Sequence, residues 1–549
     1  MASRVYIAVI CLASFLCFLT LYSRGPHLFN FQEETAIPSS AYVRVIDPGD
    51  GKKWPYRVFK SSPLRPPNLT ITGNGNALAN GYVFLTPKDR KRGGVEQHAP
   101  YIFDTDGELV FAANFSGESG TTDFRVQEVD GTPHLTFWQG SSTHGSRAGH
   151  GYGEVVFLDE EYNENKLSLR QLDIKTLKPT EVIGVVDLHE HQMTPWNSIL
   201  VTVFNNTPAD LSSVGGPQDG WVANSMVFEI DVQTQEVLFS WSPLDHVLLN
   251  ESHLPVKSYM GDGTKNALYD FFHVNSIQAV DEDRLLINSR HMWTTYLLSR
   301  KDGHIIWRID GETGGDFGTL PENGHFAWQH HARAHNVTET SMMISWFNNH
   351  FYRNSNPTAP PTSGLVMELS LPPDKTKPPR LVRNFVLPDE HLHSGSQGSH
   401  QAVLENGNSF IGYGELPVAL DYGPGADGSE VRWKARFGHD GYVHSFRAFK
   451  HTWQATPKTW NPSLLVELDE YSSDGIVGVH GYASWNGATE ISKWNVYTGS
   501  NKDDLHKMGL AMKYGFETRF EIDVVSDGCV QVGTVLPCGK ERRSNVACI

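Results

Sequence analysis

Cysteine is almost absent from the body of this chain. Cys11 and Cys17 lie in an apolar N-terminal run, and the other three cysteines fall within the last 21 residues. No thiol is therefore available for catalysis in the body of the chain. The late cysteines, Cys529, Cys538 and Cys548, permit one disulfide with one thiol left over in an oxidising compartment, or three free thiols.

The chain also lacks a block of positive charge. It carries 45 Lys and Arg against 62 Asp and Glu, for a formal net charge of −17. Nucleic-acid binding requires clustered Lys and Arg, so we expect no nucleic-acid partner. Helical periodicity is equally scarce, whereas short β-rich runs, glycines and aromatic residues are frequent, and this pattern predicts an all-β fold.

One long apolar run is present at residues 5–22, between Arg4 and Arg24. Its length lies between that of a signal-peptide core and that of a membrane-spanning helix. We therefore expect residues 1–24 to be a signal anchor or a cleaved signal peptide. Both place the rest of the chain in the secretory pathway, as the lumenal or extracellular body of a single-pass membrane protein or as a secreted protein. Five glycosylation sequons agree with this expectation: Asn68, Asn114, Asn205, Asn250 and Asn336.

Histidines recur at intervals of 57 to 84 residues, each ahead of a further β-rich run. They are His189, His273, His330 and His400, followed by runs at 198–206, 284–290, 341–349 and 408–414. Repeats of this length are typical of propeller blades, in which equivalent positions line a central channel. The spacing therefore predicts that the four histidines meet in such a channel.

A second repeat consists of an Asp-containing turn followed by a β run. Its six copies lie at 103–113, 172–179, 230–241, 300–309, 372–385 and 423–437. Asp, Gly and Thr supply the geometry of hairpin turns, so six copies predict about six blades. We expect a Pro-rich linker at 25–67, a six-bladed β-propeller at 68–450, and a small fibronectin type III-like β-sandwich at 453–549.

An ordered series of motifs resembles the arylsulfotransferase family, in its fungal-type branch. The series includes FWQG at 137–140, GHGYGEVVFLDEEY at 149–162, DLHEHQMT at 187–194, YDFFHVNSI at 269–277, INSR at 287–290, FAWQHHAR at 326–333 and SQGSHQ at 396–401. WNGATE at 485–490 resembles the family's C-terminal extension. The resemblance implies a six-bladed propeller in which a histidine takes a sulfuryl group from a small aryl sulfate. That group then passes to a phenolic or alcoholic acceptor, without adenylyl sulfate or another cofactor.

The same resemblance implies a set of site residues. His330 in the Gln-His pair matches the nucleophile, His273 and Asn275 match a His-x-Asn motif, and Arg290 and His189 match two further site positions. A neutral imidazole can accept a sulfuryl group, and a second can act as acid or base.

Each of the other matched side chains suits one part of sulfuryl transfer. The planar fork of Arg290 suits sulfate oxygens. Asn275 would hold an oxygen or fix a histidine tautomer, and His189 would donate to another oxygen. Glu190 should point to the face opposite His189 if the strand is regular.

Two departures from the family pattern leave other interpretations open. His331 and Asn348 stand where relatives carry acidic residues, so a catalytically degenerate binding propeller, secreted or anchored through its N-terminal segment, is one alternative. Another is a non-haem iron enzyme with His189, His273, His330 and His400 as ligands, since imidazole suits iron. The fixed charge of Arg290 opposes a nearby cation. For His331 and His400 we expect structural roles.

Overall fold

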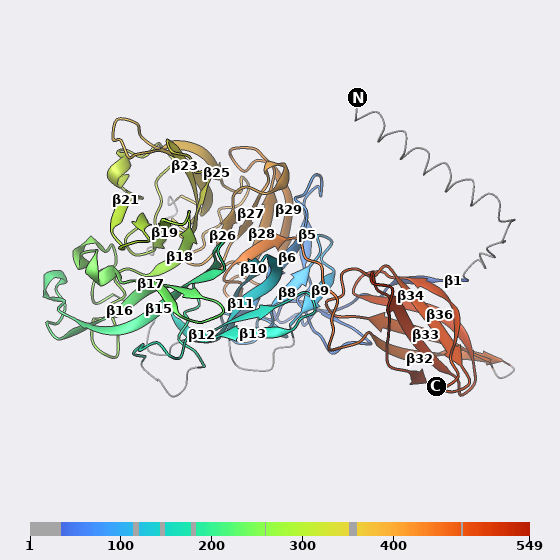
Figure 1. Cartoon of the computed structure of the whole chain (residues 1–549). Coiled ribbons are helices and arrows are strands. Elements are labelled where there is room, and N and C mark those ends of the chain that lie inside the picture. The colour runs from blue at the N-terminus through green and yellow to red at the C-terminus, as the bar shows by residue number, and fades with distance from the viewer. Residues whose placement is uncertain are drawn as a thin grey trace, which may run out of the picture.

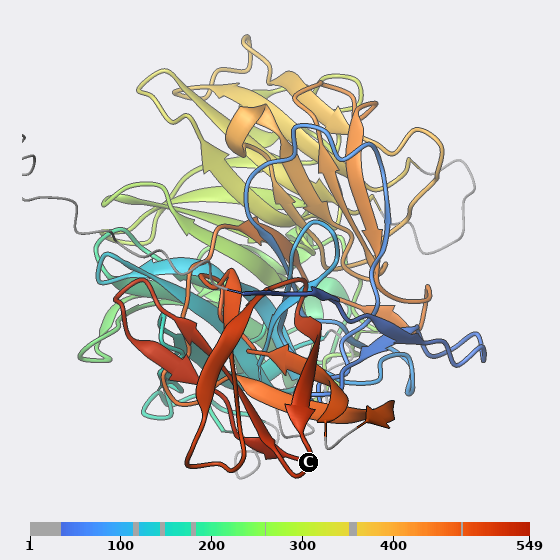
Figure 2. The same cartoon turned by 90° about the vertical axis from the view of Figure 1, so that its right-hand side faces the viewer.

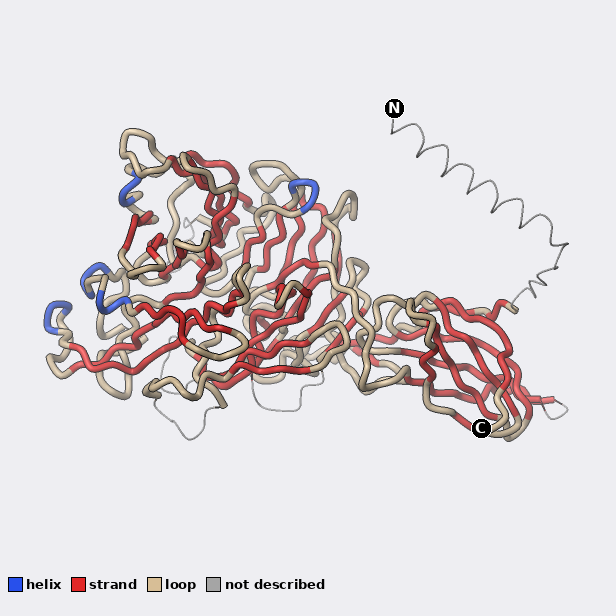
Figure 3. The backbone as a smooth tube through the Cα atoms, in the orientation of Figure 1, coloured by secondary structure: helices blue, strands red, loops and turns tan. Residues whose placement is uncertain are grey.

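The computed structural model describes residues 35–113, 120–142, 149–176, 183–258, 260–350, 360–473 and 476–549. Within these ranges the regular structure is made of strands, apart from 3-10 helices of three residues each (Figure 3). These helices are Ser212–Val214, Pro243–Asp245, Leu249–Glu251, Gly315–Phe317 and Glu405–Gly407. The fold is therefore all-β, as predicted.

Five antiparallel sheets follow one another along the chain, and in each the strands pair in sequence order. They contain β10 (Gly120–Val129), β11 (Thr132–Ser142), β12 (Gly151–Leu158) and β13 (Glu164–Leu167); β14 (His191–Met193), β15 (Ser198–Ala209), β16 (Gly220–Asp231) and β17 (Val237–Trp241); β18 (Val274–Ala279), β19 (Arg284–Ser289), β20 (Thr294–Ser299) and β21 (Ile305–Asp310); β22 (His330–His335), β23 (Ser341–Asn348), β24 (Ser363–Ser370) and β25 (Arg380–Phe385); and β26 (Ser399–Gln401), β27 (Ser409–Gly412), β28 (Val418–Tyr422) and β29 (Val431–Arg436), with β5 (Thr70–Thr72) added beside β29.

A sixth sheet joins the two ends of this region. Its order is β31 (Ala448–His451), β6 (Tyr82–Leu85), β8 (Tyr101–Phe103) and β9 (Leu109–Ala112). Ala448 pairs with Leu85, so a late strand completes a sheet that begins early in the chain. Strands β10, β14, β18, β22, β26 and β31 contact one another in succession, and β31 also contacts β10. The succession of contacts therefore returns to the sheet where it began.

Apolar side chains fill the spaces between neighbouring sheets. One core cluster combines Val227 of β16 with Ile277 of β18 and Leu285 of β19. The next combines Leu286 of β19 with Ile344 of β23. Because strand side chains alternate between two faces, each of these sheets can bury apolar residues against both neighbours.

The Asp-containing turns precede the last strand of their sheets in five of the six copies. Asp231, for example, accepts hydrogen bonds from the backbone N–H groups of Gln233 and Thr234 just before β17. The copy predicted at 172–179 differs, because the last strand of its sheet, β13, ends at Leu167, before the copy begins. A shorter turn at Asp159 serves that sheet, with Asp159 accepting from the N–H groups of Glu161 and Asn163.

A two-sheet sandwich lies to one side of these sheets (Figures 1 and 2). Its sheets contain β1 (Ala36–Ile37), β35 (His506–Met512), β34 (Lys493–Gly499), β37 (Cys529–Val535), β38 (Glu541–Arg543) and β39 (Ala547–Cys548), and β2 (Ser39–Ala41), β36 (Glu517–Val525), β33 (Ile476–Ser484) and β32 (Ser463–Ser473). They enclose a core of their own that includes Trp494 and Phe520. Cys529 and Cys548 form a disulfide, and Cys538 is free and exposed.

The early part of the chain differs from the expected irregular linker. Strands β1 and β2 pair with β35 and β36 of the C-terminal sandwich, and β3 (Arg44–Ile46) forms a hairpin with β4 (Tyr56–Val58). A further short pair joins β7 (Lys88–Asp89) to β30 (Val443–His444). The proline-rich composition did not reveal strands of two or three residues whose partners lie hundreds of residues away.

No helix among the described residues is long and apolar enough to cross a bilayer. The apolar run at 5–22 lies outside the described residues, as does Asn114. Asn250 and Asn336 are exposed. Asn68 and Asn205 are half-buried, and their side-chain oxygens accept hydrogen bonds from Arg57 and from the backbone of Lys175.

Candidate functional site

Buried imidazoles gather where strands of three different sheets begin. His189 precedes β14, His273 precedes β18 and His150 precedes β12. Their ring centres are 4.7 Å apart for His189 and His273, 5.3 Å for His150 and His273, and 6.1 Å for His150 and His189. With His291, Asp187 and Asp270 they form what we call the histidine cluster.

Two carboxylates orient the imidazoles of this cluster. Asp187 Oδ2 lies 2.5 Å from His189 Nδ1, and Asp270 Oδ2 lies 2.5 Å from His273 Nδ1. Burial alone would raise the pKa of each carboxyl, but His189 beside Asp187, and His150 and His291 beside Asp270, lower it overall. Each carboxylate is thus ionised and directs the opposite ring nitrogen, Nε2, of its histidine away from itself.

The backbone at this site is unusual for side-chain-bearing residues. His273 has φ of +54° and Trp328 has φ of +56°. The left-handed region costs about 1–3 kcal/mol for such residues and persists only where surrounding contacts enforce it. The peptide N–H of Arg290 donates to the carbonyl of His273, which holds one of these strained residues in place.

His330 lies beside this cluster at the start of β22 and is buried. Its Nε2 accepts a hydrogen bond from the backbone N–H of Gln397 at 3.1 Å, so its proton is on Nδ1, which donates to Asn349 Oδ1 at 2.7 Å. Burial and the nearby charge of Arg290 hold the pKa of His330 well below its usual value. His330 is therefore a neutral imidazole at neutral pH.

Arg290 is held beside both His330 and the histidine cluster. Its Nη1 donates to His291 Nε2 at 2.9 Å, its Nη2 donates to the carbonyl of Gly395 at 3.0 Å, and its guanidinium lies 4.9 Å from the ring centre of Trp328. A buried, fixed guanidinium suits an anionic group. Burial lowers the pKa of His273 well below its usual value, and the neighbouring His189, His150 and Arg290 lower it further.

Asn275 is fully buried and faces structural partners rather than the histidine rings. Its Nδ2 donates to the carbonyl of Gln329 at 2.8 Å, and its Oδ1 accepts from Asn288 Nδ2 at 2.7 Å. Gln329 precedes His330, and its own side-chain amide donates to Asn288 Oδ1. The amide network therefore fixes the backbone that carries His330.

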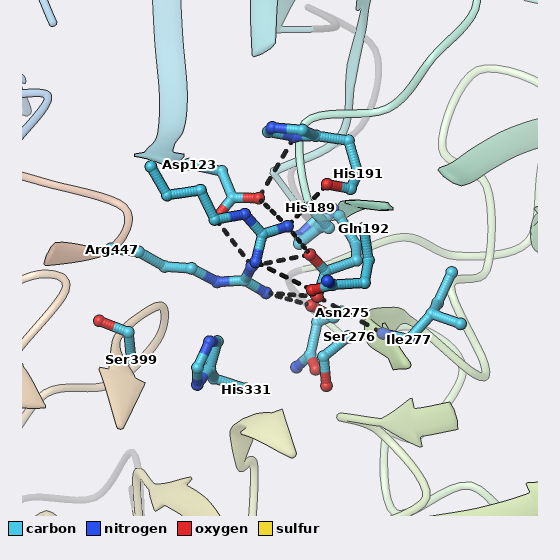
Figure 4. Close-up of polar contacts among 12 residues, drawn as sticks. Asp123, His189, His191, Gln192, Asn275, Ser276, Ile277, His331, Ser399 and Arg447 are labelled. Atoms are coloured by element: carbon cyan, nitrogen blue, oxygen red, sulfur yellow. Dashed lines mark hydrogen bonds and ion pairs between the residues drawn. The ribbon is translucent and has the colours of Figure 1, made fainter. Parts of the chain in front are cut away.

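A second group of buried charged residues, which we call the arginine cluster, is made of Arg125, Arg333, Arg447, Asp123 and Glu190. Figure 4 labels Asp123 and Arg447 of this cluster together with His189. Glu190 contacts Arg125 at 2.6 Å, Arg333 at 2.6 Å and Arg447 at 3.1 Å. Asp123 contacts Arg447 at 2.8 Å and Arg125 at 3.2 Å. Burial opposes ionisation of Glu190, but the three guanidiniums hold its pKa well below the usual range.

Glu190 joins the arginine cluster and His189 the histidine cluster, so these adjacent side chains diverge. The regular strand on which that expectation rested is absent here, because β14 begins only at His191. His331 repeats this pattern beside His330. Its Nδ1 contacts the carbonyl of His400 at 3.2 Å, and its pKa is lowered by burial and then by Arg333 and Arg447 of the arginine cluster.

His400 does not join the other three histidines of the sequence repeat. Its Nδ1 contacts the carbonyl of Trp346 at 3.1 Å, and burial lowers its pKa to about 3. Within the described ranges, two groups of side chains lie close enough to hold a metal, His150 with Asp270 and His273, and His150 with Asp187 and His189, and neither group contains His330 or His400. The four-histidine iron site considered from the sequence is therefore wrong in its ligands, because β26 turns His400 toward the neighbouring strand β23.

Sequence reasoning missed four members of the histidine cluster: His150, Asp187, Asp270 and His291. Three of them were visible in the quoted motifs, His150 in GHGYGEVV, Asp187 two residues before His189, and Asp270 three residues before His273. A carboxylate close before each of two site histidines was the available signal. His150 could not be found by the repeat, since it enters the site from the third strand of its sheet rather than the first.

Comparison with known proteins identifies one family. A family model described as Arylsulfotransferase (ASST) matches residues 125–438. No curated protein matches the chain. Among solved structures, a protein of unknown function from Bacteroides caccae is 10% identical with a TM-score of 0.36, covering 68% of this chain and 100% of that one. BBS1N in complex with ARL6DN is 9% identical with a TM-score of 0.24, covering 79% of this chain and 96% of that one.

Proposed function

Because the chain belongs to the arylsulfotransferase (ASST) family, we propose that it moves a sulfuryl group from an aryl sulfate to a phenolic or alcoholic acceptor through His330. The observation that carries this proposal is a neutral buried imidazole beside a fixed guanidinium and two carboxylate-oriented histidines. A sulfuryl acceptor needs a lone pair on nitrogen and positive charge near the transferred oxygens.

The architecture that we propose is a six-bladed propeller, with the site at one end of its central channel. Six sheets of mainly antiparallel strands and the succession of contacts from β10 through β31 back to β10 support it. In such a closed fold the joining of β31 to β6 would link the first and last blades. We also assign the chain to the fungal-type branch of the family, on the motifs quoted above.

In the first half-reaction, His330 Nε2 would form a bond to sulfur while the bond from sulfur to the aryl oxygen breaks. The electron pair leaves with the aryl oxide. The backbone N–H of Gln397, which now occupies the Nε2 lone pair, would have to change partner, and a sulfuryl oxygen is a suitable acceptor. Arg290 would stabilise the charge that develops on the leaving and equatorial oxygens.

In the second half-reaction, the oxygen of the acceptor would attack sulfur and release His330. The acceptor proton must go to a base, and neutral His273, oriented by Asp270, is placed for that role. His189 would donate to a sulfuryl oxygen. Asn275 is assigned a positioning role, because its side chain holds the carbonyl of Gln329.

The test is to look for a sulfurylated histidine by peptide mass spectrometry after exposure to 4-nitrophenyl sulfate. We expect the adduct on the peptide containing His330 and its absence from His330→Gln. His400→Gln is the matched control, since His400 is a buried histidine of the same repeat outside the site. An adduct retained in His330→Gln, or none in the wild type while product forms, would contradict the covalent route.

We further propose that the folded body resides in the secretory pathway. The disulfide between Cys529 and Cys548 and the exposed sequons at Asn250 and Asn336 support this placement. Glycosidase treatment of protein from a glycosylating host should increase gel mobility, and substitution of both asparagines by Gln should reduce that shift. Unchanged mobility in wild type would oppose the proposal.

A further inference from the structure

Three half-buried aromatic side chains lie together beside Arg290, and we call them the aromatic wall: His253, Trp293 and Trp328. The rings of His253 and Trp293 are stacked, with centres 3.7 Å apart and planes inclined by 5°. Trp328 packs against Trp293 at 75°, with ring centres 5.4 Å apart. The three rings therefore form one continuous aromatic surface.

This surface borders the groups to which the proposed function assigns the sulfuryl. Trp328 lies two residues before His330, and its ring centre is 4.9 Å from the guanidinium of Arg290. The ring of His291 lies 5.7 Å from that of Trp328. At the other end of the wall, the backbone N–H of His253 donates to the carbonyl of His291 at 2.9 Å. Both ends of the wall thus contact the residues that hold Arg290.

The tryptophans of the wall differ from those of the cores. Trp138, Trp241 and Trp346 are at most 2% exposed, and each indole N–H donates to an acceptor within the fold. Trp293 and Trp328 are half-buried, and the N–H of Trp293 has no acceptor among the described residues. Large aromatic rings that remain partly exposed next to a polar site are typical of a ligand-binding surface.

The backbone holds both tryptophans in a conformation that bulky residues rarely adopt. Trp293 has φ of +50° and Trp328 has φ of +56°. Such conformations persist only where the surrounding contacts enforce them. The N–H of Gly311 donates to the carbonyl of Trp293 at 2.8 Å, and the N–H of Ala327, just before Trp328, donates to Asn348 Oδ1 at 3.2 Å. The fold therefore sets the positions of both rings.

We infer that the aromatic wall binds the ring of the aryl sulfate donor and, after the first product has left, the ring of a phenolic acceptor. One oxygen joins ring to sulfur in an aryl sulfate, so a sulfate held by Arg290 would place the ring beside Trp328. Because the displacement is in line, the leaving and attacking oxygens both lie opposite His330. The same surface therefore serves both rings in turn. The inference rests on the proposed function and names Trp328 and Trp293 as the residues that favour phenols over aliphatic alcohols.

The first test measures binding without turnover, using the full chain with His330→Gln. Isothermal titration calorimetry would compare 4-nitrophenyl sulfate with hexyl sulfate, which carries the same charged group on an aliphatic chain. Addition of Trp328→Leu should weaken binding of the aryl sulfate about 10-fold, as expected for the loss of an aromatic contact. Binding of hexyl sulfate should change much less. Trp328→Phe, which keeps an aromatic ring, should restore most of the lost selectivity.

Trp196→Leu is the matched control. Trp196 is also a half-buried tryptophan beside an arginine, with its ring centre 5.1 Å from the guanidinium of Arg300. Its indole N–H donates to Glu229 rather than to a residue of the site. Its substitution should leave the preference for the aryl sulfate unchanged.

The second test compares kcat/KM for phenol and for hexanol as acceptors, with 4-nitrophenyl sulfate as donor and His330 intact. The ratio of the two values should fall about 10-fold in Trp328→Leu and in Trp293→Leu. Circular dichroism would establish folding, and Trp293→Leu keeps the test decisive if Trp328→Leu does not fold. Sulfuryl transfer with an unchanged ratio in folded variants would overturn the inference and leave the proposed function intact. Ring-selective binding that Trp328→Leu removes, in a protein that transfers no sulfuryl, would support the wall and count against the proposed function.

Discussion

The histidine cluster and the arginine cluster are neighbours that share the segment around His189 and Glu190, yet they pair different kinds of group. In the arginine cluster, both carboxylates contact more than one guanidinium. In the histidine cluster, the two carboxylates contact imidazoles. Each cluster has buried atoms without a hydrogen-bond partner among the described residues, such as Asp123 Oδ2 in the first and Asp270 Oδ1 in the second. The arginine cluster therefore pairs fixed charges, whereas the histidine cluster pairs carboxylates with groups that can gain or lose a proton.

Adjacent residues supply both clusters, which makes the comparison testable one position at a time. His189 and Glu190 diverge to opposite sides, and so do His330 and His331. Substitutions at the histidines that face the site should therefore affect turnover far more than stability. Substitutions in the arginine cluster should do the reverse.

The largest effect is expected for His330→Ala. Removing the group that carries the sulfuryl should lower the rate of transfer from an aryl sulfate to a phenol by at least about 10³-fold. The unfolding free energy should change less than for Glu190→Ala, since the side chain of His330 forms its hydrogen bonds, among the described residues, with Asn349 and Gln397 and not with an ionic partner. Steady-state kinetics and urea unfolding measure the two quantities. Wild-type turnover in His330→Ala would refute the assignment.

Glu190→Ala should have the next largest effect, on stability. It leaves Arg125, Arg333 and Arg447 buried with only Asp123 to compensate them. Removing one partner of a buried ionic group typically costs about 3–5 kcal/mol. Urea unfolding of Glu190→Ala should be compared with that of His189→Ala. His189 is adjacent to Glu190 in the chain but belongs to the histidine cluster. Equal losses of stability in the two variants would mean that the clusters do not differ as we argue.

Part of this comparison was accessible from the sequence. The repeat predicted that His189, His273, His330 and His400 would meet, and His400 does not join the other three. Glu190 does point away from His189, but the two residues precede β14, so strand alternation is not the reason. The arginine cluster was not predicted. Its members are single charged residues, and only the folded arrangement brings Arg447 beside Asp123, more than 300 positions away.

His400 shows where a repeat fails as a guide. It occupies the same place in the sequence pattern as His330, but it contacts the carbonyl of Trp346 instead of a shared site. A position in a repeat predicts the strand and its face. It does not predict which of the neighbouring groups a buried side chain reaches, since that depends on the packing of the adjacent sheet.

A smaller effect is expected from His400 when the pH falls, because its buried imidazole resists protonation in the folded protein. The unfolding free energy should decrease by about 2 kcal/mol between pH 7 and pH 5. The pKa of His400 is about 3 in the folded protein and about 6.5 when unfolded, so the unfolded state takes up a proton first and is favoured below pH 6.5. Between pH 7 and pH 5 the unfolding free energy of the wild type should therefore fall by about 2 kcal/mol more than that of His400→Gln. His400→Gln also loses packing contacts, but that loss of stability is the same at both pH values. Comparing the pH dependence of urea unfolding in the two proteins therefore isolates the effect of protonation. Parallel curves for the two proteins would contradict the depressed pKa.

The smallest effect, and the one that most directly compares the site histidines, is expected for Asn349→Asp. His189 and His273 have a carboxylate on Nδ1, whereas His330 has the amide oxygen of Asn349 at 2.7 Å. A carboxylate there would favour the imidazolium and raise the pKa of His330. Because the neutral ring is the nucleophile, activity of the variant should be lost at a higher pH than in wild type as the solution is acidified. At pH 8 the rate should change only a few-fold, roughly 1 kcal/mol or less in activation free energy.

The pH profile of kcat/KM measures the shift of the acid limb. Asn348→Asp is the control, since Asn348 forms hydrogen bonds with Ala327 and His325 rather than with His330. An acid limb that moves in Asn348→Asp but not in Asn349→Asp would show that His330 is not the group whose protonation limits the rate.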